Sequence, residues 1–250
     1  MTTTTKVRLS ILVLLGISAS GFLAGWGFIW LLRGSYPTAI VIFAAVPYLV
    51  GFAVHMAYVV WGTARPRTHY GPEGTLIRPP KWADRMFYMS FLSAVLGAVL
   101  YLGFLAAGMI DFHLPQGYRR VDIVICVFLI GFGAPALLRA FKHGGESHLL
   151  LNPDGFEVWN GFWGSFVRGR WDDVEQIEDR PLRGRRNGRE VIVIGRPKGR
   201  AAMFMSDAVT DDSDALREWV RFYWQHPEHR NELLDERALR RLDEADITTG

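Results

Sequence analysis

The stretch VRGRWDDVEQIEDR, residues 167–180, decides how this chain is organised. It is polar, it places two aspartates directly after Trp171, and it follows soon after the last of four long apolar runs. Single apolar residues that alternate with short charged runs are typical of strands in a water-exposed domain. We therefore expect a membrane part followed by a soluble part.

The composition of the chain changes sharply near Lys142. The 250 residues are 50% hydrophobic with a net charge of only +3, but Leu, Val, Ala, Gly and Phe dominate before this point and Arg, Asp and Glu after it. Such a split predicts a membrane region over residues 1–142 and then about 100 soluble residues, enough for one small domain. The only cysteine, Cys126, lies in an apolar run, so we expect no disulfide framework and no cysteine-based metal site.

Four apolar runs are long enough to cross a bilayer. About 18 or more consecutive apolar residues suffice for a transmembrane helix. The first run is too long for the apolar core of a secretory signal, so we expect it to remain as a helix. The predicted membrane region is therefore all-α, with four transmembrane helices over residues 9–32, 38–62, 86–110 and 121–138.

The loops predict the orientation of these helices. Basic residues precede the first run, as Lys6 and Arg8, and they are frequent in the loop over residues 63–85. Since basic residues concentrate on the cytoplasmic side, we expect both termini in the cytoplasm. The protein would then be a multi-pass protein of the cell (inner or plasma) membrane, with the lipid bilayer as its first partner.

The predicted spans carry few polar groups. None has Asp, Glu, Lys or Arg in its middle, which counts against an ion-coupled transporter or a proton pump. His55 is the one ionisable group well inside a span. It could be a proton or ligand site, but a neutral imidazole bonded to a neighbouring helix is the commoner case. The pair Gly21 and Gly25 favours close helix packing, either within the molecule or in a homo-oligomer.

The soluble half combines short strands with one amphipathic helix. HLLL, the turn NPDG at residues 152–155 and FEVWN form the pattern of a β-hairpin. Near the end, TDDSDALREWVRFYWQHP begins with acidic capping candidates. It then places Leu216, Trp219, Val220 and Tyr223 along one helical stripe. We expect an α+β domain in which several antiparallel strands form a small open barrel closed by the helix.

These segments, in this order, resemble the bacterial PH-like (pleckstrin-homology-like) domains that are appended to membrane helices. The resemblance covers residues 148–225: a strand at 149–151, a turn ending in glycine at 154–155, a second strand at 156–159, and a Trp-led segment at 171–174. The end, FYWQHPEHRNEL, resembles that of actinobacterial membrane proteins. The resemblance implies a cytoplasmic PH-like antiparallel β-barrel over 146–226, capped by a C-terminal helix, then a helical or disordered tail over 227–250. Its expected core includes Trp171, Val174, Leu216, Trp219 and Val220.

The segment RPLRGRRNGR, residues 180–189, holds a cluster of arginines. Such a cluster could attract anionic lipid head groups or an acidic protein partner, or it could be a solvated loop. Classical PH domains hold phosphoinositides through their first hairpin, which here is the turn NPDG without a basic residue. Specific phosphoinositide recognition is therefore not expected, and neither is nucleic acid as a partner. The candidate binding residues are Arg180, Arg183, Arg185, Arg186 and Arg189.

The sequence predicts no catalytic residues, metal or cofactor. His226, His229 and Glu232 are spaced by three residues, but they lack the spacing of the zincin motif and are expected on a solvent-facing helix. A phosphate-binding glycine loop and a catalytic triad are also missing from the sequence. We therefore expect a membrane-anchored interaction or regulatory protein, not an enzyme, whose soluble domain binds a protein partner or an anionic membrane surface. The alternatives are a small transporter or channel component formed by oligomerisation, and a membrane-located defence or superinfection-exclusion protein.

Overall fold

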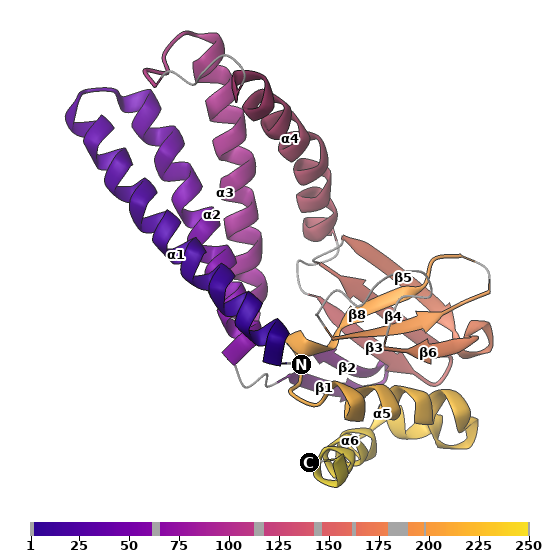
Figure 1. The fold of residues 1–250 in the computed structure, drawn as a ribbon. Coiled ribbons are helices and arrows are strands. Elements are labelled where there is room, and N and C mark those ends of the chain that lie inside the picture. Colours follow the sequence, from indigo (N-terminus) through magenta and orange to yellow (C-terminus); the bar gives the residue numbers. More distant parts are fainter. Residues whose placement is uncertain are drawn as a thin grey trace. The chain divides into compact units, whose positions relative to one another are not determined.

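A computed structural model describes residues 3–61, 66–112, 118–142, 147–161, 164–179, 190–197 and 199–249 (Figure 1). The chain forms two compact units. The membrane unit consists of Lys6–Val60 and Arg85–Gly144. The soluble unit consists of Met1–Thr5, Trp61–Asp84 and Gly145–Gly250. The predicted division at residue 142 is therefore too simple, because the soluble unit also takes up a segment from between two membrane helices.

The membrane unit is built from four long helices: α1 (Thr3–Leu32), α2 (Tyr36–Trp61), α3 (Lys81–Ala106) and α4 (Tyr118–Lys142). Each contains a stretch long and apolar enough to cross a membrane, namely Val7–Leu32, Tyr36–Tyr58, Lys81–Ala106 and Val121–Lys142. The four predicted segments are thereby confirmed as helices of sufficient length and apolarity to cross a membrane. Many of their large apolar side chains are exposed in the chain alone, for example Phe132 and Leu138, which suits a lipid environment.

Glycines allow the helices of the membrane unit to approach closely. A Cβ built on Gly16 would lie 3.2 Å from the Cβ of Ala53, and small residues at such places permit tight backbone packing. Among the described residues, no atom lies within 4 Å of the equivalent position on Gly21 or Gly25. The pair singled out in the sequence is thus not what packs α1 onto α2. Close approaches of the other helices include those of Gly51 to Ser90 and of Gly133 to Val95.

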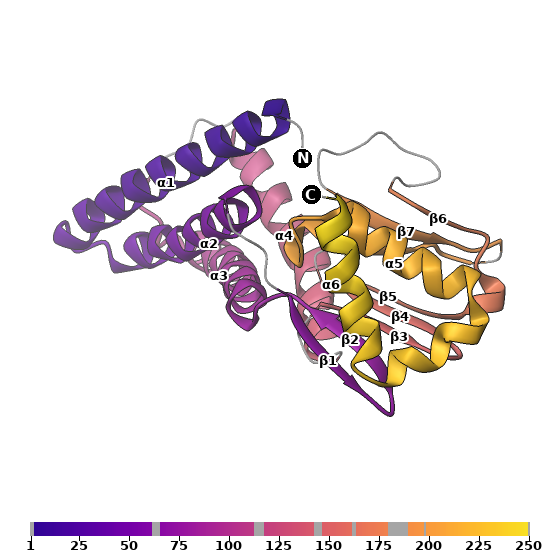
Figure 2. The same ribbon diagram turned by 90° about the horizontal axis from the view of Figure 1, so that it is seen from below.

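The soluble unit contains two antiparallel sheets. The first has the order β1-β2-β3-β4-β5 (Figure 2), and the second has the order β6-β7-β8. The strands are β1 (Arg67–Gly71), β2 (Gly74–Arg78), β3 (His148–Asn152), β4 (Gly155–Asn160), β5 (Ser165–Arg170), β6 (Gln176–Glu178), β7 (Val191–Gly195) and β8 (Ala202–Met205).

The α+β class of the soluble domain is confirmed, but its described strands do not form a closed barrel. The chain leaves the first sheet through a 3-10 turn, η1 (Trp171–Asp173), and this turn separates β5 from β6. The two sheets meet at β4 and β8, where Asn160 Nδ2 donates a hydrogen bond to the Met203 carbonyl at 2.8 Å.

The hairpin β1–β2 comes from the loop between α2 and α3, which the sequence analysis treated only as a basic loop. Strand β2 pairs with β3, with Ile77 opposite Leu149 and Thr75 opposite Leu151. Ile77 and Thr75 are fully buried. The sheet therefore joins two segments separated by about seventy residues, including α3 and α4.

The core of the soluble unit lies between the sheets and helix α5 (Ser213–Gln225). Asp212 caps this helix by accepting a hydrogen bond from the Ala215 amide at 2.8 Å. Its apolar stripe is buried against side chains of both sheets, among them Leu149, Phe156 and Ile192. Another 3-10 turn, η2 (Ser206–Ala208), precedes the helix.

The residues after 226 are not a separate tail. They form η3 (Pro227–Leu234) and α6 (Arg237–Thr249), and both pack on the soluble core. Leu233 and Ala238 are fully buried. The Leu233 carbonyl accepts a hydrogen bond from Thr75 Oγ1 at 2.7 Å, and the Ala238 carbonyl accepts one from Trp219 Nε1 at 2.8 Å. The predicted boundary at 226 is thus replaced by a domain that continues to α6.

Candidate functional site

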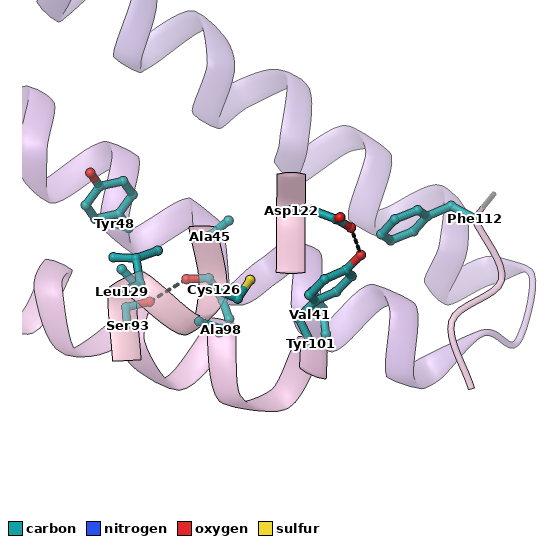
Figure 3. Close-up of a pocket in the computed structure, with 13 residues that line it drawn as sticks. Val41, Ala45, Tyr48, Ser93, Ala98, Tyr101, Phe112, Asp122, Cys126 and Leu129 are labelled. Carbon is teal, nitrogen blue, oxygen red and sulfur yellow. Dashed lines mark hydrogen bonds between the residues drawn. The ribbon is translucent and has the colours of Figure 1, made fainter. Parts of the chain in front are cut away.

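A cavity of about 310 Å³ lies within the membrane unit (Figure 3). Its walls come from α2, α3 and α4, and Phe112, between α3 and α4, lies at one end. The lining is almost entirely apolar. The lining residues are Val41, Ala44, Ala45 and Tyr48 of α2, Ser93, Ala94, Gly97, Ala98 and Tyr101 of α3, Phe112, and Asp122, Cys126 and Leu129 of α4.

Small side chains create this space. A Cβ on Gly97 would lie 3.2 Å from the Cβ of Ala44, so α2 and α3 touch there almost backbone to backbone. Ser93 Oγ donates a hydrogen bond to the Ala44 carbonyl and ties the same two helices together. Because these residues project little, room remains between the two helices and α4.

One end of the cavity is polar. Tyr101 Oη donates a hydrogen bond to Asp122 Oδ2, and the Ile123 amide donates one to Asp122 Oδ1 at 3.0 Å. Both carboxyl oxygens of Asp122 therefore act as hydrogen-bond acceptors. Tyr101 also lies parallel to Phe112, with ring centroids 6.2 Å apart. The result is a carboxyl group beside two aromatic rings at the end of an apolar space.

Asp122 is not among the functional residues predicted from the sequence. Asp122 is only the second residue of the predicted span 121–138, and charged residues were expected to mark a functional site only in the middle of a span. An acidic residue just inside an apolar run was the available signal. Its partner Tyr101 is 21 residues away on another helix, and only the packing of α3 on α4 reveals that the two meet.

The arginine cluster predicted from the sequence lies outside the described residues. This applies to Arg180, Arg183, Arg185, Arg186 and Arg189. The five residues expected in the core are all buried: Trp171, Val174, Leu216, Trp219 and Val220.

The histidines near the C-terminus take part in an ion-pair cluster. The sequence suggested that Glu232 faces solvent, but this residue is buried. Arg241 binds both of its carboxylate oxygens, with Nη2 at 3.0 Å from Oε1 and 2.9 Å from Oε2. His229 Nδ1 lies 3.0 Å from Glu232 Oε1, and Tyr223 Oη donates to Oε2 at 3.2 Å. Within the described residues, no group of three or more His, Cys, Asp or Glu could hold a metal ion.

The cluster shifts the pKa values of several of its members, Glu232 and Tyr223 among them. Burial alone would raise the pKa of Glu232, but hydrogen bonds from Arg241 and His229 outweigh it, so this pKa is lowered. Burial and the neighbouring Glu232 carboxylate raise the pKa of Tyr223. The cluster joins η3 and α6 to α5, and its geometry is that of a structural tie.

His55 is buried within the membrane unit. Its ring lies against that of Phe87 on α3, with centroids 5.4 Å apart. It does not line the cavity described above.

Comparisons with protein-family models, with curated proteins and with solved structures find no match to this chain.

Proposed function

We propose that this protein is a membrane-anchored interaction protein whose soluble unit is a cytoplasmic PH-like domain that holds a protein partner along strand β1. The observation that carries the proposal is the edge position of β1. In the described part of the chain, β1 pairs with β2 alone, and its other edge bears no strand. Figure 2 shows β1 as the outermost strand of its sheet.

The side chains of β1 support this role. Thr68, His69 and Tyr70 are all exposed, although successive side chains of a strand point to opposite faces. These three side chains are therefore not part of the core, although the strand itself lies near η3. An exposed strand edge is a template for another strand, and extended peptides commonly bind by adding to such an edge.

The register shows which backbone groups are available. Gly71 pairs with Gly74 across a two-residue turn, and hydrogen-bonded pairs alternate with non-hydrogen-bonded pairs from there on. The pair of His69 and Leu76 then bonds across β1–β2. The N–H and C=O groups of Thr68 and Tyr70 point away from β2, toward an added strand.

Two further points support the PH-like and cytoplasmic parts of the proposal. Consecutive antiparallel strands form two sheets, and helix α5 follows them and packs on both, which is the order that the sequence resemblance implies. The basic residues of segments 63–85 and 1–8 favour the cytoplasmic side. Contact of the arginine-rich segment 180–189 with anionic lipid is a second candidate role, supported by its five arginines.

Site-specific photo-crosslinking tests the proposal. A photoreactive residue replaces Tyr70 in the full-length protein in its native membrane, and we expect a discrete crosslinked protein. Thr68→Pro removes an outward N–H, so it should abolish the crosslink, whereas Thr68→Val keeps the N–H and should preserve it. Equal crosslinking in the Pro and Val variants would show that no strand is added at β1.

A folding control accompanies the crosslinking. His69→Pro removes an inward N–H and should loosen the β1–β2 hairpin itself. Limited proteolysis of each variant separates the two effects, because Thr68→Pro should leave the hairpin as resistant as wild type. A crosslink lost only in variants that are also proteolysed would contradict the proposed edge docking.

A further inference from the structure

We propose that the cavity of the membrane unit binds an amphiphilic organic cation taken up from the lipid phase. The apolar body would occupy the space between α2, α3 and α4, and the positive charge would lie at Asp122. This site goes beyond the proposed function and does not depend on it.

The walls of the cavity select the body of the ligand. With a volume of about 310 Å³, the cavity is at the lower end of the range for small-molecule sites. Ala44, Gly97 and Leu129 offer no hydrogen bonds from their side chains, and the Ser93 hydroxyl already donates to the Ala44 carbonyl. A polar molecule would lose its hydration without replacement there, so an apolar body is favoured.

The carboxylate selects the charge. Asp122 is the second residue of the candidate span Val121–Lys142, so it lies at the end of the apolar stretch. Asp122 accepts one hydrogen bond at each oxygen, while a carboxylate offers about four lone-pair positions. Acceptor capacity therefore remains for a cationic group.

The aromatic rings reinforce this selection. Tyr101 and Phe112 lie parallel to each other beside Asp122 (Figure 3). Aromatic faces attract organic cations through their quadrupole, most strongly where water is excluded. An uncharged lipid chain would use the apolar walls but would gain nothing from the rings and the carboxylate. The combination therefore indicates a cation rather than a lipid tail.

Binding of a charged probe and of an uncharged analogue tests the proposal. The full-length protein is placed in nanodiscs of neutral lipid, so that the bilayer does not concentrate cations. Radiolabelled tetraphenylphosphonium is the probe, and triphenylphosphine oxide is the uncharged competitor. We expect saturable binding of the cation that the oxide displaces at least tenfold less effectively than unlabelled cation. This comparison uses the wild-type chain and does not rely on any variant folding.

Substitutions then locate the charge. Asp122→Asn keeps the shape of the side chain and should weaken cation binding at least tenfold, while Asp122→Glu should retain it. Leu138→Phe on α4 is the matched control, because Leu138 is 69% exposed and does not line the cavity. It should bind as wild type does.

Cys126 provides a direct readout of occupancy. It is the only cysteine of the chain, and it lines the cavity. The cation should slow its alkylation by N-ethylmaleimide. In a Cys126→Ala, Leu138→Cys double variant, the reporter thiol lies outside the cavity and should not be protected. Absence of saturable cation binding would overturn the proposal, and so would equal protection by the uncharged oxide together with unchanged binding in Asp122→Asn.

Discussion

At the scale of single residues, Trp171 holds the corner between the two sheets of the soluble unit. Its indole Nε1 donates a hydrogen bond to the Asn152 carbonyl at 2.8 Å, and its ring lies 6.1 Å from that of Phe156. The guanidinium of Arg230 lies 5.3 Å from the ring centroid. Only 2% of Trp171 is exposed. The indole thus links η1, the turn between β3 and β4, and η3.

Truncation of this residue should destabilise the soluble unit strongly. Trp171→Ala removes a buried ring and leaves the Asn152 carbonyl without its donor, so we expect a loss of about 3–5 kcal/mol in unfolding free energy. Pulse proteolysis of the full-length protein in urea measures the change. Phe166→Ala is the control, because Phe166 is 41% exposed on β5 and should lose less than about 1 kcal/mol. Equal losses in the two variants would contradict the anchoring role of Trp171.

The pair of Glu232 and Arg241 makes stability depend on acid pH. The pKa of Glu232 is lowered in the folded protein, so the unfolded chain binds the proton more readily as the pH falls. The stabilisation from Glu232 is therefore fully present above the ordinary glutamate pKa of about 4.3, and it is lost as the pH falls through the lower folded value.

Glu232→Gln should remove this part of the acid sensitivity. We expect the variant to be less stable than wild type at pH 7, and the difference in unfolding free energy should shrink as the pH is lowered to about 3. Unfolding measured at several pH values in this range provides the test. Glu236→Gln, in a largely exposed pair with Arg240, is the matched control and should follow the wild-type profile. A constant offset between Glu232→Gln and wild type would disprove the linkage.

At the scale of elements, the β1–β2 hairpin is inserted into a sheet made mainly by the second half of the chain. Its turn is bounded by two glycines with different constraints. Gly74 has a φ of +121°, and a Cβ there would lie 2.2 Å from the Leu151 carbonyl oxygen. A Cβ on Gly71 would have only His69 Nε2, at 3.8 Å, as a neighbour. One glycine is required by the pairing of β2 with β3, and the other is not.

Gly74→Ala and Gly71→Ala should therefore differ. In the first variant, both the backbone conformation and the clash with a carbonyl oppose the side chain, so we expect a loss of more than about 2 kcal/mol and detachment of the hairpin. Gly71→Ala should cost less than about 1 kcal/mol. Hydrogen exchange of segment 67–78 reports the detachment. Similar protection in the two variants would show that β2 does not depend on this close approach.

The arginine-rich segment 180–189 can be tested as an element by itself. The full-length protein in nanodiscs should bind anionic vesicles through its soluble unit, and this binding should weaken as the salt concentration rises. Replacing Arg183, Arg185 and Arg186 by Ala should reduce that binding, with about 1 kcal/mol lost per residue in contact. Vesicle sedimentation measures the effect, and Arg237→Ala on α6 is the control. Unchanged binding in the triple variant would assign the segment to solvent.

At the scale of the whole molecule, the sheet constrains the membrane topology. Because β2 pairs with β3, the segment between α2 and α3 and the residues after α4 must lie on the same side of the membrane. The segment between α1 and α2 then lies on the opposite side, if each helix crosses once. The basic residues favour the cytoplasm for the first side.

Thiol labelling should show this arrangement. In a Cys126→Ala background, Glu73→Cys should react with a membrane-impermeant maleimide only from the cytoplasmic side, and Arg33→Cys only from the outer side. Inverted and right-side-out vesicles supply the two sides. Labelling of both positions from one side would contradict the four-span topology.

The three helices that line the cavity are each followed or preceded in the chain by a strand of the first sheet. α2 leads to β1, Pro79 and Pro80 alone separate β2 from α3, and α4 leads to β3. Arg67 Nε donates a hydrogen bond to the Pro79 carbonyl at 3.1 Å, and the Ser147 amide donates one to Asp84 Oδ2 at 2.9 Å.

The local features of this protein could be predicted from the sequence. The four membrane helices follow from the length of their apolar runs, which is a property of consecutive residues. The hairpin of β3 and β4 follows from the turn NPDG, where the Asn152 side chain accepts a hydrogen bond from the Gly155 amide at 2.7 Å. Helix α5 follows from its acidic cap and from an apolar stripe of helical period.

Contacts between distant segments were decided by the tertiary structure alone. The five residues of β2 have no pattern that separates them from a loop until β3 supplies a partner. The hydrogen bond from Thr75 to Leu233 spans 158 positions, and the one from Tyr101 to Asp122 joins two helices. Hydrogen bonding and burial depend on which surfaces meet in space, and a one-dimensional pattern does not contain that information. For this reason the sequence predicted the four long helices, the β3–β4 hairpin and α5, while the discontinuous soluble unit and the polar end of the cavity emerged only from the fold.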